Sequence, residues 1–266
     1  MDDLFSEGSQ PLLERLSCCG WGMRYMEMLR ADPLASHMLG FVKDLLAPVD
    51  SMSKSGASLA FRSRYSHLER VTERALRICD IEGGDAGVIA VAAIFHDSGY
   101  CRGGDGHAWH SARIFDEYAA KHLPELLRGG ATSSVSLVSS VSLASSIYAA
   151  VASAASLLKI REIIAIHSDK QMPSGDISLE ARILMDADLL DEAGAMSVLF
   201  DCFLEASEQV FDYNSAFERI LARYLSEDES VAAAMFHTKE GKRCFINTRR
   251  YVGEFINGLK DELCLQ

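Results

Sequence analysis

Proline is scarce in this sequence, and regular strand patterns are missing. Only five of the 266 residues are proline and none follows Pro173, so long helices can run without interruption. No segment shows the sustained alternation of apolar and polar residues that marks a half-buried strand. Apolar residues recur instead at helical spacing, at Leu68, Val71, Ala75 and Ile78, and near the C-terminus at Phe245, Val252, Phe255, Ile256, Leu259 and Leu263. The sequence therefore predicts an all-α protein.

Basic residues are also in deficit. The sequence has 26 Lys and Arg against 38 Asp and Glu, which leaves a formal net charge of −12. Nonspecific binding to nucleic acids depends on Lys and Arg neutralising phosphates, so we expect no nucleic-acid scaffold as a partner. A small phosphorylated ligand attracted by a metal ion is compatible with this charge.

The seven cysteines form no CxxC pair and are odd in number. This pattern argues against a disulfide framework or a zinc knuckle. The opening MDDLFSEGSQ is acidic and polar, whereas an export signal is basic and then apolar. We therefore expect a cytoplasmic protein.

One stretch, residues 131–158, lacks charge altogether and has the length of a membrane span. It is built mainly from Ser, Ala, Val and Leu, and its ten serines dilute its hydrophobicity. Candidate site residues flank it on both sides, and a membrane between them would keep them apart. We expect an insertion that forms a helix packed on one side, and no membrane partner.

Residues 51–60 (SMSKSGASLA) have the composition of a linker. They follow an N-terminal helical section, residues 1–50, and precede a main body, residues 61–200, which includes the Ser/Ala-rich stretch. Residues 201–266 are expected to form C-terminal helices packed on this body. The whole chain would then make one continuous domain.

Imidazoles and carboxylates lie near the ends of several predicted helices. AAIFHDSGY brings His96 and Asp97 to the end of an apolar run, where desolvating both is costly unless something binds them. The other candidates are His67 in YSHLERVTERALRI, His107 and His110 in GHAWHSARIFDEYAA, His167 in REIIAIHSDK, and Asp188 and Asp191 in LEARILMDADLLDEAGA. Each histidine alone is compatible with a helix cap or a satisfied core residue, and the aspartates with a solvated helix face. Together they predict a site for a divalent first-row metal, whose usual ligands they are.

The order of His67, the His96-Asp97 pair and Asp188 resembles the H…HD…D signature of the HD-domain metal-dependent phosphohydrolase superfamily. The words HLERV and AAIFHDSG resemble its first and central motifs, and ILMDADLLDEAGA resembles the closing motif of small bacterial members. The resemblance covers about residues 61–200 and implies an HD-domain helical bundle with additional N- and C-terminal helices. It also implies that His67, His96, Asp97 and Asp188 are the ligands of one metal ion. Asp188 is preferred over Asp186 because the family's ligand follows a small residue.

Further histidines resemble the ligands of family members with two metals. HAWHSA favours His110 over His107 as the next ligand, and IIAIHSD resembles the one after it, His167. Asp97 would then bridge two ions. His107 and His122 are expected to be surface or structural residues.

The residues around these ligands suggest further roles in the reaction. Many relatives carry a Lys soon after the HD pair, whereas HDSGYC offers Tyr100, so a phosphate contact by that Lys cannot be carried over. Arg70 and Lys170 are candidates for cationic contacts with a phosphate. Asp191 and Glu192 are candidates for the general acid, or for a group that hydrogen-bonds a ligand histidine.

The resemblance implies a hydrolase that cleaves a phosphomonoester or phosphodiester of a nucleotide or another small phosphorylated metabolite. Water activated by one divalent ion, or two, would attack near Asp97, and the ion could be Mn²⁺, Mg²⁺, Fe²⁺, Co²⁺ or Ni²⁺. Two alternatives stay open. One is a di-iron oxygenase on the HD scaffold, with ligands His67, His96, Asp97, His110, His167 and Asp188. The other is a noncatalytic sensor or partner-binding module.

Overall fold

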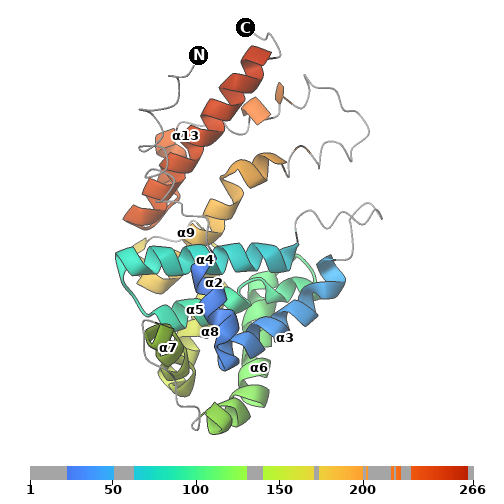
Figure 1. The fold of residues 1–266 in the computed structure, drawn as a ribbon, viewed down its shortest axis with the longest axis vertical. Helices are drawn as coiled ribbons and strands as arrows, with labels where there is room; N and C mark the ends of the chain where they lie inside the picture. The colour runs from blue at the N-terminus through green and yellow to red at the C-terminus, as the bar shows by residue number, and fades with distance from the viewer. Residues whose placement is uncertain are drawn as a thin grey trace, which may run out of the picture.

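The protein is described by a computed structural model that covers residues 23–50, 63–130, 140–170, 174–199, 202, 217–218, 220–222 and 229–262. These ranges contain helices and no strand, as the sequence predicts (Figure 1). The helices are α2 (Arg24–Ala31), α3 (Pro33–Asp50), α4 (Arg64–Glu82), α5 (Ala86–Phe95), η2 (Ser98–Arg102), α6 (His107–Gly130), α7 (Ser140–Ala152), α8 (Ala154–Ile166), η3 (Ser174–Asp176), α9 (Leu179–Glu192), α12 (Glu229–Ala234) and α13 (Lys239–Glu262).

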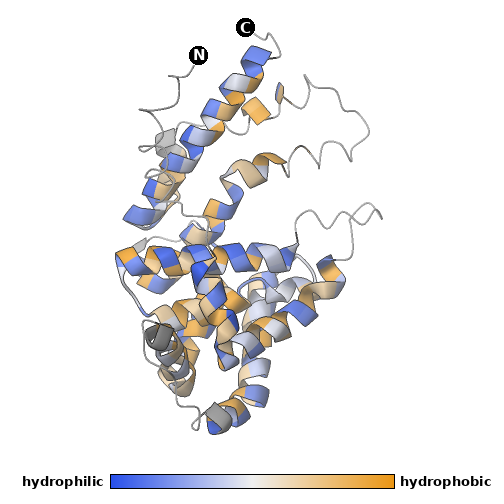
Figure 2. Ribbon diagram, viewed as in Figure 1, coloured by the Kyte–Doolittle hydropathy of each residue, from blue (hydrophilic) through white to orange (hydrophobic). Residues whose placement is uncertain are grey.

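Helix α5 lies at the centre of the bundle. All of its residues from Gly87 to Phe95 are buried, and α3, α4, α6, α7, α8 and α9 pack around it. Figure 2 shows hydrophobic residues on the inner helices and hydrophilic residues along the outer faces. The side chain of Asp85 caps α5 by accepting the N–H groups of Gly87 and Val88. A wholly apolar helix thus delivers the polar pair that follows it to the interior of the protein.

Helix α4 is amphipathic and packs on α5 and α9. Its predicted apolar stripe is confirmed, because Leu68, Val71, Ala75 and Ile78 are all buried. Two residues fix its first turn. Ser63 accepts the N–H of Ser66, and Asp50 at the end of α3 accepts the backbone N–H of Arg64 at 2.6 Å. His67 therefore lies one turn inside a firmly capped helix.

The N-terminal helices α2 and α3 join the same core through buried residues that include Met26, Leu29, Met38 and Leu46. The side chain of Glu73 on α4 accepts the backbone N–H groups of Tyr25 and Met26, which ties the start of α2 to α4. The predicted linker, residues 51–60, lies outside the described residues.

The Ser/Ala-rich stretch is part of the core from residue 140 onward, and residues 131–139 lie outside the described ranges. Helix α7 buries Leu143, Ile147 and Val151 and packs directly on α5. A Cβ atom at Gly87 would collide with the backbone carbonyl of Ser146, so the two helices approach closely because their facing residues are small. Within the described residues, no helix combines the length and apolarity needed to cross a membrane.

The C-terminal helix α13 packs against α9, α4 and α12 at one end of the bundle (Figure 1). The buried carboxylate of Asp186 holds its N-terminal end by accepting the N–H of His237 at 2.8 Å and the N–H and Oγ–H of Thr238 at 2.7 and 2.6 Å. A Cβ atom at Gly241 would strike the same carboxylate.

The predicted apolar stripe of this C-terminal segment is only partly correct. Phe245, Val252 and Ile256 are buried, but Phe255 is 57% exposed. Leu259 packs against a smaller apolar cluster, and Leu263 lies outside the described residues.

Candidate metal centre

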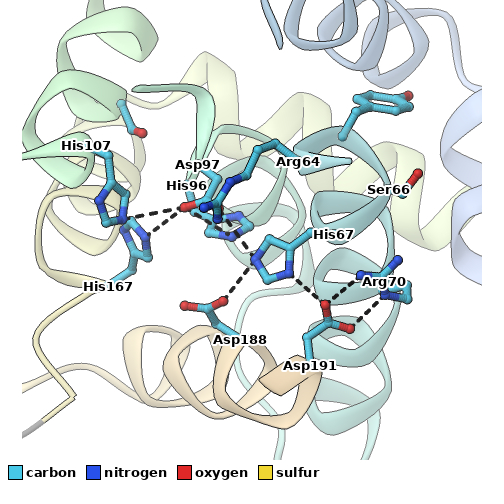
Figure 3. A network of polar contacts seen from close by, with 12 residues as sticks. Arg64, Ser66, His67, Arg70, His96, Asp97, His107, His167, Asp188 and Asp191 are labelled. Carbon is cyan, nitrogen blue, oxygen red and sulfur yellow. Dashed lines mark hydrogen bonds and ion pairs between the residues drawn. The ribbon is translucent and has the colours of Figure 1, made fainter. Parts of the chain in front are cut away.

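Six ionisable side chains, from five helices or the residues that directly follow them, meet inside the bundle (Figure 3). They are His67 from α4, His96 and Asp97 after α5, His107 at the start of α6, His167 after α8 and Asp188 from α9. Three of the imidazoles and Asp97 are at most 3% exposed. Such burial is costly for polar groups that lack a partner.

Hydrogen bonds fix the orientation of each imidazole at Nδ1. His96 and His167 each follow the last residue of a helix, and their Nδ1–H groups donate to the carbonyls of Ala93 and Ile164, both at 2.7 Å. His107 donates in the same way to the carbonyl of Gly104 at 3.1 Å. Because a carbonyl oxygen can only accept, these contacts assign the proton to Nδ1 and leave the lone pair on Nε2.

The Nε2 atoms face the two carboxylates. Nε2 of His67 lies 3.1 Å from Oδ1 of Asp188 and 3.5 Å from Oδ2 of Asp97. Nε2 of His167 and of His107 lie 3.4 and 3.6 Å from Oδ1 of Asp97. Nε2 of His96 is buried and has no hydrogen-bond partner within the described residues. An orphaned, buried lone pair of this kind is what a metal ion would satisfy.

Two overlapping groups of donor atoms lie close enough to hold an ion. His67, His96 and Asp188 form one group, and His96, Asp97 and His167 form the other, with the donor atoms of each group within 4.8 Å of one another. Neutral imidazoles and carboxylates suit divalent first-row metals. The two oxygens of Asp97 face different histidines, Oδ1 toward His167 and Oδ2 toward His67. This geometry suits a carboxylate that bridges two ions.

The electrostatics of the cluster keep both carboxylates ionised. Burial alone would raise the pKa of Asp97, but His96, His167 and His67 hold it well below its usual range. Burial likewise opposes ionisation of Asp188, and Lys170 and His67 outweigh it, so its pKa is also lowered. Burial would lower the pKa of His67, yet its hydrogen bonds to Asp188 and Asp191 raise it to about 9. Metal binding at His67 would therefore release a proton.

Residues 64–193 match the family model described as HD domain. The chain contains an HD domain. Among solved structures, an HD-superfamily hydrolase from Bacillus thuringiensis is similar with a TM-score of 0.52 and 18% identity, over 87% of this chain and 97% of that one. YpgQ of Bacillus subtilis in complex with ADP is similar with a TM-score of 0.51 and 16% identity, over 85% and 93% of the two chains. A search of curated proteins found no match. The fold is thus the all-α HD-domain fold.

Asp191 of the HD domain lies outside the donor cluster, next to His67. Oδ2 of Asp191 accepts the Nδ1–H of His67 at 2.7 Å. Arg70 binds the same carboxylate through two parallel hydrogen bonds of 2.8 and 2.7 Å, and Arg74 adds a further contact. Burial would raise the pKa of Asp191, but Arg70, His67 and Arg74 lower it strongly.

These contacts decide between the two roles expected for Asp191 and speak against the role expected for Arg70. A carboxylate with a strongly lowered pKa holds no proton to donate, so Asp191 is unsuited as a general acid and instead orients His67. Arg70 donates from Nε and Nη2 to Asp191. These donors are therefore occupied, and the position of Arg70 does not favour a contact with the substrate phosphate. Lys170 does reach the centre. Its ammonium donates to Oδ2 of Asp188 and to the carbonyl of His167, both at 2.6 Å.

The structure also corrects the choice between the two histidines that open α6. His107 lies beside Asp97, whereas the ring of His110 packs against Trp109 and its Nδ1 is buried without a hydrogen-bond partner among the described residues. The cause is Gly99, whose N–H donates to Oγ of Ser111 at 2.8 Å. A Cβ atom at Gly99 would collide with the carbonyl of His107, so the glycine lets α6 begin directly against the HD turn. The glycine of HDSG was the available signal for this close approach.

Sequence reasoning missed one cation at the centre. Nη1 of Arg64 lies 3.5 Å from Oδ2 of Asp97, and its guanidinium lies over the ring of Tyr100 with Cζ 3.7 Å from the ring centroid. Arg64 precedes His67 by three residues, which is one helical turn on the same face. That spacing could have identified it.

Proposed function

We propose that this protein is a metal-dependent phosphohydrolase that cleaves a small phosphorylated metabolite. The proposal rests on four histidines that share one arrangement, with Nδ1 bound to a fixed acceptor and Nε2 directed toward the group formed by Asp97 and Asp188. A bound divalent ion would lower the pKa of a water molecule and polarise a phosphoryl oxygen. The HD-superfamily hydrolase fold supports this class of reaction.

The chain's own residues would supply positioning and charge. Asp97 and Asp188 stay ionised, as ligands must, and the Asp191 carboxylate holds the ring of His67 in one orientation. Lys170 binds Asp188 at the edge of the cluster, where its side chain is 15% exposed. The burial of His96 and His167 excludes bulk water from the inner side of the site, which strengthens each electrostatic contact there.

The decisive experiment is a panel of phosphomonoesters and phosphodiesters, offered to protein loaded in turn with Mn²⁺, Mg²⁺, Fe²⁺, Co²⁺ and Ni²⁺. Nucleoside phosphates belong in this panel because the similar YpgQ structure contains ADP. His96→Ala and Asp97→Ala should abolish metal content and hydrolysis together. His122→Ala is the matched control, since His122 packs on Phe41 and Tyr118 away from the cluster. Full activity in the His96 and Asp97 variants would rule the mechanism out.

A di-iron oxygenase is a second candidate, because the two oxygens of Asp97 face different histidines and so suit two ions. In this version His107 replaces His110 in the expected ligand set. Two irons per chain together with substrate-dependent oxygen consumption would favour the oxygenase. Phosphate release without oxygen consumption would favour the hydrolase. A noncatalytic module predicts neither, and retains its biological activity when the metal is removed.

The remaining expectations concern the substrate, the partners and the cellular location. A small phosphorylated substrate, no nucleic-acid or membrane partner, and a cytoplasmic location all stay predictions. Cell fractionation and co-purification of bound metabolites would test them.

A further inference from the structure

Arg64, Tyr100 and His107 form a three-layered stack at the edge of the metal centre. The rings of Tyr100 and His107 are stacked with centroids 4.4 Å apart and an angle of 22° between planes. The guanidinium of Arg64 covers the ring of Tyr100, a favourable cation–π contact. The stack comes from three elements, α4, η2 and α6, so it fixes the guanidinium relative to the donor atoms.

The stacking contact with Tyr100 holds Arg64 more firmly than its ion pair with Asp97 does. Its single contact to Asp97 is 3.5 Å long, whereas Arg70 binds Asp191 through two bonds of 2.7 and 2.8 Å. The side chain of Arg64 is 27% exposed, whereas the side chain of Asp97 is only 5% exposed. A guanidinium has five N–H donors in a planar fork, so most of those of Arg64 remain for a ligand that enters from solvent.

The charges around the donor atoms call for an anion. Asp97 and Asp188 are balanced by Arg64 and Lys170, and Asp191 and the nearby Glu192 are balanced by Arg70 and Arg74. A divalent ion would therefore leave the site with an excess of positive charge, although the whole chain carries −12. A terminal phosphate, with a charge of about −1.5 to −2, offsets this excess better than a singly charged phosphodiester.

We propose that Arg64, held flat on Tyr100, binds the phosphoryl group of the substrate and that the site prefers a terminal phosphate to a phosphodiester. The proposal rests on the hydrolase function proposed above. The planar fork of Arg64 binds two phosphate oxygens at once, which a lysine cannot do. Tyr100 supports this contact as a positioning residue, because its ring lies between the guanidinium of Arg64 and the ring of His107.

The test compares 4-nitrophenyl phosphate with bis(4-nitrophenyl) phosphate on wild-type, Arg64→Ala and Arg64→Lys protein. Arg64→Ala should raise KM for the monoester about 10- to 100-fold, with Arg64→Lys in between, because charge-assisted hydrogen bonds are lost. KM for the diester should rise less, since the diester presents one anionic oxygen fewer to Arg64. Tyr100→Phe should keep the wild-type KM, and Tyr100→Leu should raise it.

Two readouts separate this proposal from the function on which it rests. Metal content per chain should be the same in the Arg64 variants and the wild type. Titration calorimetry with inorganic phosphate on Mn²⁺-loaded protein should show an affinity at least tenfold weaker in Arg64→Ala. The control is Arg30→Ala, because Arg30 is an exposed arginine of α2 that pairs with Glu69 of α4, the helix that carries Arg64.

Several outcomes would overturn the proposal. Unchanged phosphate affinity in Arg64→Ala would show that Arg64 does not bind the phosphoryl group. Loss of metal from that variant would show that Arg64 has a structural role. A wild-type protein that prefers the diester excludes the selection for a terminal phosphate. If the wild type hydrolyses no phosphoester at all, the proposed function fails, and the phosphate titration still decides whether Arg64 binds an anion.

Discussion

Nδ1 of His67 and Oδ2 of Asp191 lie 2.7 Å apart, although 124 residues separate them in sequence. The contact joins α4 to α9 immediately behind the candidate metal centre. It fixes the imidazole ring and leaves Nε2 facing Asp188. The pair of arginines that surround Asp191 keeps this carboxylate ionised and in place.

Asp191→Asn should weaken metal binding about 10- to 100-fold with little loss of fold, because the substitution removes the charge that orients His67 while keeping the shape. Competition with a chromophoric chelator measures the affinity. Asp116→Asn serves as the control, since Asp116 is an exposed aspartate paired with Arg161. Equal affinities in wild type and Asp191→Asn would mean that the contact is structural only.

Gly99→Ala should destabilise the protein by about 1 to 3 kcal/mol, because the new methyl group would collide with the carbonyl of His107 and push α6 away. His107 would then leave Asp97, and the metal content should fall. Chemical denaturation and metal analysis test the two effects. Gly175→Ala is the control, because no atom lies within 4 Å of the methyl group it would add. A variant with wild-type stability and metal content would contradict the tight contact.

Thr238→Val should loosen α13 from α9. The hydroxyl of Thr238 donates to Asp186 and accepts the N–H of Gly241 at 2.9 Å, so its loss leaves a buried carboxylate with one bond fewer. We expect a decrease of about 1 to 3 kcal/mol in the free energy of unfolding, and faster amide exchange along α13. The same substitution at half-buried Thr248 is the control. Unchanged exchange along α13 would show that other contacts hold this helix.

Glu180 predicts a pH-dependent contribution to stability. Burial would raise its pKa, but Lys159 and the N–H of Asp85 lower it below the ordinary value of 4.5. A carboxyl whose pKa is depressed in the folded state stabilises the fold above its unfolded pKa, and this stabilisation is lost as the pH falls.

Glu180→Gln should therefore be less stable than the wild type at pH 7 by about 1 to 2 kcal/mol, and the difference should shrink between pH 5 and pH 3. Urea denaturation at a series of pH values measures it. Glu162→Gln, at an exposed position of α8, should change little at any pH. A difference for Glu180→Gln that stays constant with pH would contradict the assigned cause.

Helical periodicity and motif order were sufficient for much of this structure. The α4 stripe is buried as predicted, and His67, His96, Asp97, His167 and Asp188 lie together. These are properties of local spacing and of residues at the ends of helices. The choice between His107 and His110 depended on where α6 begins, which a contact between Gly99 and Ser111 decides.

The pairing of Arg70 with Asp191 was equally beyond the sequence, because it joins two helices whose relative rotation no local pattern records. From the sequence alone, Arg70 could equally contact a phosphate and Asp191 could equally act as a general acid. The exposure of Phe255 has the same origin, since the apolar spacing of α13 offers more hydrophobic residues than the neighbouring helices cover.

The capping of α4 by Asp50 has a practical consequence. Asp50 accepts the Oγ–H of Ser63 and the N–H of Arg64, both at 2.6 Å, so the two ends of the intervening chain are fastened side by side. The first turn of α4, which carries Arg64 and His67, is thus held by a carboxylate of α3. Substitutions at Asp50 are accordingly expected to reduce metal binding, although Asp50 is not among the candidate ligands.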